Sequence, residues 1–162
     1  MKTIRLKWLR EILLREIPLR RDTGENLMYS ADWSKLPEAS GVYVFGRRYG
    51  KDFEALYVGK ATRLRSRVQH QCERVPLMMH LKKAKSGKRV ILVARFVPMR
   101  GGQSAAKCID IAERALIRHF MLEGHNLANK QNMRVRRHEI HSTGGKVRSA
   151  NAVPAIMFLE QR

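Results

Sequence analysis

Glu113 is the acidic residue of this chain that is best placed to hold a metal ion. Its neighbours one helical turn away are Ile109, Leu116 and Ile117, so a helix would place its carboxylate at the edge of an apolar stripe. A carboxylate there needs a partner, because burying an unpaired charge is costly. The partner is either a divalent cation or one of the chain's many arginines, and this segment alone leaves both open.

Basic residues gather in a second helical segment that follows Gly59. The candidate nucleic-acid-binding residues are Lys60, Arg63, Arg65, Arg67 and His70. Arg63 and Arg67 are four residues apart and therefore share one face of a helix. An arginine can bind a phosphate through two parallel hydrogen bonds. A solvated basic helix without a ligand would show the same pattern.

Two tyrosines, Tyr43 and Tyr57, stand on β-rich segments joined by a short turn, so their hydroxyls could meet at one place. The pKa of tyrosine is about 10, which makes it a poor base unless nearby cations lower that value. Lys60 and Arg67 are the candidates for doing so. Base, cation and metal carboxylate are the groups that phosphodiester hydrolysis needs. Without those neighbours the two residues are ordinary strand aromatics.

The order and spacing of these residues resemble the GIY-YIG nuclease family. The first family motif is similar to GVY at 41–43, and the second to YVG at 57–59, continuing to the helix arginine at Arg67. The family's metal-binding glutamate opens a Glu-x-x-Leu-Ile run, which is similar to 113–117. The resemblance covers residues 37–132. In motif it is closest to the nuclease domain of the bacterial excision-repair incision subunit.

This resemblance implies a one-metal endonuclease that acts on DNA, with RNA not excluded. Glu113 would hold one Mg²⁺, for which Mn²⁺ is a possible substitute. Tyr57, with Tyr43 as hydrogen-bond partner, would orient or deprotonate the attacking water. Lys60 would lower the tyrosine pKa or contact phosphate, and Arg67 would stabilise the charge that develops on the phosphate. The implied products carry 5′-phosphate and 3′-hydroxyl ends.

The family also has a late asparagine, for which Asn129 fits best and Asn126 competes. It would orient the glutamate or its strand neighbours. The chain departs from the family pattern four residues after Arg67, where several members have His or Tyr and this sequence has Gln71, with His70 beside it. The implied catalytic set is Tyr43, Tyr57, Lys60, Arg67, Glu113 and Asn129.

Composition supports a polyanionic partner. The 162 residues include 33 Lys and Arg against 14 Asp and Glu, a formal charge of +19, and such a charge favours nucleic acid. The same charge would suit a non-catalytic nucleic-acid-binding module, which is the alternative function. No secretory signal and no run of about 18 apolar residues is visible, so we expect a cytoplasmic protein without a membrane partner. Oligomeric state is not readable.

These residues need elements to position them. Segments 42–45, 55–58 and 89–97 are typical of strands, and 62–72, 77–81 and 104–122 of helices. The order predicts an α/β fold with a small, mainly antiparallel three-stranded sheet flanked by helices. Two extensions flank this nuclease-like domain at 37–132.

The N-terminal extension, 1–36, is predicted to be a basic amphipathic helix followed by a connector. Ile4, Trp8 and Ile12 have helical spacing, and Pro18 ends the pattern. The C-terminal extension, 133–162, is basic and ends in an apolar, strand-like segment at 153–159.

Overall fold

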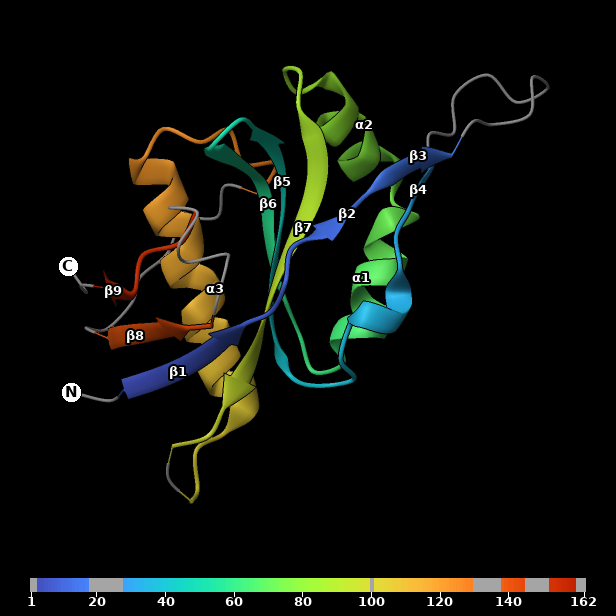
Figure 1. Ribbon diagram of the computed structural model, residues 1–162. Coiled ribbons are helices and arrows are strands. Elements are labelled where there is room, and N and C mark those ends of the chain that lie inside the picture. Colours follow the sequence, from blue (N-terminus) through green and yellow to red (C-terminus); the bar gives the residue numbers. More distant parts are fainter. Residues whose placement is uncertain (1–2, 18–27, 100, 130–137, 145–151, 160–162) are drawn as a thin grey trace.

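The computed structural model describes residues 3–17, 28–99, 101–129, 138–144 and 152–159 (Figure 1). Its strands are β1 (Thr3–Trp8), β2 (Ile12–Leu13), β3 (Arg15–Ile17), β4 (Met28–Ser30), β5 (Gly41–Tyr49), β6 (Asp52–Ala61), β7 (Lys88–Val97), β8 (His138–Thr143) and β9 (Ile156–Leu159). Its helices are α1 (Leu64–Cys72), α2 (Val75–Lys83) and α3 (Ala105–Leu122), with a 3₁₀ turn at Trp33–Lys35. The three predicted helices and the predicted hairpin are therefore confirmed.

The prediction of a small three-stranded sheet is wrong. The main sheet has seven strands in the order β6-β5-β7-β1-β8-β9, with β2 also paired to β7. The predicted strands β6, β5 and β7 are all antiparallel and form one half of it. The other half is mixed, because β1 is antiparallel to β7 but parallel to β8. Strands β3 and β4 form a separate two-stranded sheet.

The predicted N-terminal helix is also wrong, since residues 4–17 contribute strands β1, β2 and β3. Along β1 the side chains of Ile4, Leu6 and Trp8 are buried and those of Arg5 and Lys7 are exposed. That alternation has the period of two that a strand requires. The helical spacing of Ile4 and Trp8 does not explain why Leu6, between them, is also apolar and buried.

The predicted C-terminal extension contributes two strands. Its apolar end forms β9, as expected, and β9 pairs antiparallel with β8. The basic residues at 133–137 and 145–151 lie outside the described part of the chain. The predicted domain boundaries at 36 and 132 remain predictions.

The sheet has a helical layer on each face (Figure 1). One buried cluster joins α3 to Val42 and Val44 of β5, and the other joins α1 and α2 to Tyr43 and Phe45. Successive residues of β5 thus face opposite layers, as a strand dictates. Within the described residues, no helix is both long and apolar enough to cross a membrane.

The β5–β6 hairpin places Tyr43 directly opposite Gly59. A Cβ atom at Gly59 would overlap the ring and the hydroxyl of Tyr43. A Cβ at Gly41 would likewise overlap the carbonyl oxygen of Ala94 on β7. Both motif positions therefore need glycine, because neighbouring atoms leave no room for a Cβ atom. At Gly59 the neighbour is the Tyr43 ring, which can lie across β6 only because Gly59 has no side chain.

We expect Gly59→Ala to destabilise the protein by about 1–3 kcal/mol, because overpacking forces a buried neighbour to move. Urea denaturation monitored by circular dichroism gives this difference. Gly101→Ala is the matched control, since a Cβ at Gly101 meets no atom within 4 Å. Equal stabilities for the two variants would contradict the packing described for Tyr43.

Candidate functional site

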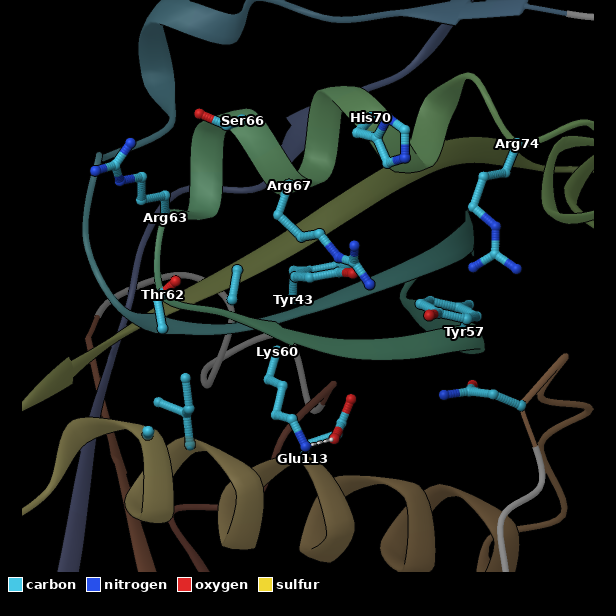
Figure 2. A pocket seen from close by; sticks show the side chains of 14 residues that line it. Tyr43, Tyr57, Lys60, Thr62, Arg63, Ser66, Arg67, His70, Arg74 and Glu113 are labelled. Carbon is cyan, nitrogen blue, oxygen red and sulfur yellow. Dashed lines mark ion pairs between the residues drawn. The ribbon is translucent and has the colours of Figure 1, made fainter.

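A cleft of about 780 Å³ lies at the β6 edge of the sheet, where α1 and α3 approach from opposite faces (Figure 2). Because β6 is an edge strand, side chains from both layers reach the same opening. The residues lining the cleft are Tyr43, Tyr57, Lys60, Ala61, Thr62, Arg63, Ser66, Arg67, His70, Arg74, Ala106, Ile109, Glu113 and Asn129.

The structure brings all six residues of the implied catalytic set to this cleft, from β5, β6, α1, α3 and the segment after α3. Of the candidate nucleic-acid-binding residues, Lys60, Arg63, Arg67 and His70 also line it. Arg65 does not. Its guanidinium donates to the carbonyl oxygen of Leu36 at 2.9 Å and lies 3.8 Å from the carboxylate of Glu38.

Glu113 lies at the edge of the buried stripe of α3, with its side chain 16% exposed. Its Oε2 atom is 2.8 Å from Nζ of Lys60 on β6. The same ammonium donates to Asp110, one turn earlier on α3, and Asp110 also pairs with Arg114 at 3.1 Å. The cationic partner of Glu113 in this structure is therefore a lysine rather than an arginine.

Lys60 is a fixed cation in this arrangement. Burial lowers its pKa, but the hydrogen bonds to Asp110 and Glu113 outweigh that effect, so the pKa of Lys60 is raised. A lysine with a raised pKa stays charged at neutral pH. It lies between two carboxylates and contributes charge to the α3 side of the cleft.

Tyr43 and Tyr57 stack, with their ring centroids 6.2 Å apart and their planes at 26°. Tyr43 is almost fully buried, whereas Tyr57 is partly exposed in the cleft. Burial raises the pKa of Tyr43 above its ordinary value, although a hydrogen bond from Arg67 acts in the opposite direction. The Arg67 cation does act to lower the pKa of Tyr43, but burial outweighs it, so the hydroxyl stays protonated and can donate a hydrogen bond.

Asn129 pairs with the edge of β6 rather than with Glu113. Its side chain accepts from the amide of Val58 at 3.2 Å and donates to the carbonyl oxygen of the same residue at 2.6 Å. The amide of Ala128 donates to Leu56 on the same edge at 2.7 Å. These contacts hold the strand on either side of Tyr57. The competitor Asn126 is exposed, and its carbonyl oxygen lies 2.9 Å from Nε2 of His80.

Sequence reasoning missed Asp110 and Arg74. Asp110 stands three residues before Glu113, so helical spacing alone would have placed the two carboxylates on one face. Arg74 follows the end of α1 and carried no motif, so nothing local distinguished it. In the folded chain Asp110 forms an ion pair with Lys60, and Arg74 lines the cleft together with the predicted site residues.

The donor chemistry of Glu113 fits one magnesium ion. Its partly buried carboxylate already holds a cation, the ammonium of Lys60. Mg²⁺ is commonly bound through one or two carboxylates, with water and substrate oxygens completing the shell. Among the described residues no group of three or more His, Cys, Asp or Glu side chains could share a metal. Glu113, with Asp110 nearby, would hold it.

Comparison of the chain with protein-family models, with curated proteins and with solved structures finds no significant match. The likeness to the GIY-YIG family therefore depends on the motifs of the sequence.

Because burial holds the pKa of Tyr43 above that of an unfolded tyrosine, we predict a specific loss of stability at high pH. The protonated form stabilises the fold fully below about pH 10, and this contribution is lost as the pH rises further. The free energy of unfolding, measured between pH 8 and 11, should fall less steeply in Tyr43→Phe than in the wild type. Tyr49→Phe, at a residue that is 41% exposed, is the control for removing a phenol from the surface. Parallel curves for Tyr43→Phe and the wild type would contradict the assignment.

Proposed function

We propose that this protein is a magnesium-dependent endonuclease of the GIY-YIG type that hydrolyses phosphodiester bonds in nucleic acid, with DNA as the expected substrate. One observation carries the proposal. Six residues chosen by motif spacing, from positions 43 to 129, line a single cleft at one sheet edge. The formal charge of +19 supports a polyanionic substrate.

The two walls of the cleft have different roles in this proposal. The α1 wall presents Arg67, which lies over the Tyr43 ring and points toward the opening (Figure 2). A preorganised guanidinium there would stabilise the negative charge that grows on the phosphate oxygens. The α3 wall presents Glu113, and Mg²⁺ bound there would supply further neutralisation of that charge.

Tyr57 is the candidate for aiming the attacking water. Its ring stacks on the Tyr43 ring, and its side chain is partly exposed in the cleft. Asn129 binds the backbone of the next residue, Val58. Water attack forms one P–O bond and breaks the P–O3′ bond, so the ends expected from the family resemblance are a 5′-phosphate and a 3′-hydroxyl. Tyr43, kept protonated by burial, acts in this scheme as a donor rather than as a base.

The Lys60–Glu113 ion pair is the observation that favours the alternative function. A glutamate neutralised by a lysine can serve as a structural charge pair in a module that binds nucleic acid without cutting it. The two functions differ in one respect: only the nuclease needs the carboxylate of Glu113 for turnover, and both need the cations of the α1 wall.

We therefore predict that Glu113→Gln abolishes cleavage while it leaves DNA affinity within about threefold of the wild type, because the residue serves the cation and is not a phosphate contact. The assay incubates the protein with plasmid, nicked, branched and single-stranded DNA and with RNA, in Mg²⁺ and in EDTA. Binding is followed separately by fluorescence anisotropy.

Glu123→Gln is the matched control, since it removes the same charge from an exposed position just beyond the same helix. This control should cut at the wild-type rate. If the wild-type protein binds DNA but cuts none of these substrates in Mg²⁺, the non-catalytic module is the correct reading. If Glu113→Gln cuts as fast as the wild type, the metal site is misplaced.

A further inference from the structure

A further arginine lies in the cleft beside Arg63 and Arg67, which the sequence predicted. Arg74 occupies the N-cap position of α2, immediately after α1. Figure 2 shows Arg67 and Arg74 reaching down from the same wall, Arg67 over Tyr43 and Arg74 toward Tyr57. Both line the cleft. The Tyr57 end of the cleft therefore has its own guanidinium.

Arg74 is held in place by a buried group. Its Nη1 atom donates to Oε1 of Gln71 at 3.0 Å, and Gln71 is a fully buried residue of α1. An arginine side chain normally loses considerable rotamer freedom when it binds a ligand. A guanidinium that is already braced loses less, and it keeps its other N–H groups for a second partner.

Neither Arg67 nor Arg74 is neutralised by a carboxylate in the described part of the chain. Several other arginines there have one: Arg47 pairs with Glu54, Arg48 with Glu11, and Arg114 with Asp110. Arg67 and Arg74 are exposed, and each adds an unpaired charge to an already cationic protein. An anion in the cleft would relieve that repulsion.

Arg67 and Arg74 start from different elements of the wall. Arg67 lies within α1, which ends at Cys72, and Arg74 precedes the first turn of α2. Their guanidiniums reach the cleft at separate places, over Tyr43 and toward Tyr57 (Figure 2). Each can therefore bind its own phosphate.

We propose that Arg74 forms a second phosphate subsite, which binds a different phosphate of the substrate strand from the one held by Arg67. The inference rests on the proposed function, and it specifies the substrate further. The strand must continue past the reacting phosphate toward the Tyr57 end of the cleft. A substrate that ends at the reacting bond on that side lacks the second contact and binds more weakly.

The test measures binding with the Glu113→Gln protein, so that no substrate is cut. A set of labelled duplexes, each with one neutral methylphosphonate at a different position of one strand, is titrated by fluorescence anisotropy. The titrations are repeated after adding Arg67→Ala, Arg74→Ala or Lys83→Ala. Lys83→Ala removes the same charge from an exposed position on α2 that does not line the cleft.

We expect one methylphosphonate position to weaken binding by tenfold or more when Arg74 is present and to have no effect in Arg74→Ala. A different position should respond in the same way to Arg67→Ala. Lys83→Ala should leave both effects intact. The salt dependence of binding should also fall by about 0.9 in log–log slope for Arg74→Ala.

The subsite is disproved if no position depends on Arg74, or if Arg67 and Arg74 depend on the same position. These outcomes are independent of cleavage. A protein that never cuts DNA but shows two separate positions retains the subsite and loses the nuclease function. A protein that cuts DNA but shows no position coupled to Arg74 retains the nuclease function and loses the subsite.

Discussion

The site depends on the pairing of Tyr43 with Gly59 across the β5–β6 hairpin. Only a residue without a Cβ atom leaves room for the Tyr43 ring above β6. That ring then packs against Tyr57, and its hydroxyl lies within the influence of the Arg67 cation, so β5, β6 and α1 meet at one point. A shift of one residue in this register would place the two tyrosines on opposite faces of the sheet.

Charge is divided unequally between the two walls of the cleft. On the α3 side, Lys60 is held by Asp110 and Glu113, so its charge is largely compensated within the protein. On the α1 side, Arg67 and Arg74 are exposed and have no carboxylate partner among the described residues. A phosphate backbone is therefore attracted to one wall, while the carboxylates of the other wall are the natural place for a cation.

Local spacing predicted the parts of this site that are set by short-range geometry. The hairpin, α1 and α3 each carry their motif residues at positions that a strand or helix period fixes. Arg65, by contrast, does not line the cleft, because it is two residues away from both Arg63 and Arg67. A residue at that spacing lies on another side of the helix, where Arg65 donates to the carbonyl oxygen of Leu36. The extra half of the sheet could not be read locally, because β1 pairs with β8 more than 130 residues later. The sequence of β1 fits either a helical or a strand period. Only the burial of Leu6 between its two exposed basic neighbours shows that the period is two.

The central claim is that a divalent cation held at Glu113 contacts the phosphate that is cut. The most direct measurement uses DNA with one phosphorothioate at the cleaved bond, prepared as separate diastereomers, with single-turnover rates in Mg²⁺ and in Mn²⁺. Sulfur is a poor ligand for Mg²⁺ and a better one for Mn²⁺. We expect one diastereomer to be cut at least tenfold more slowly than the other in Mg²⁺ and to recover in Mn²⁺. Equal rates for both diastereomers in both metals, or no cleavage of unmodified DNA, would contradict it.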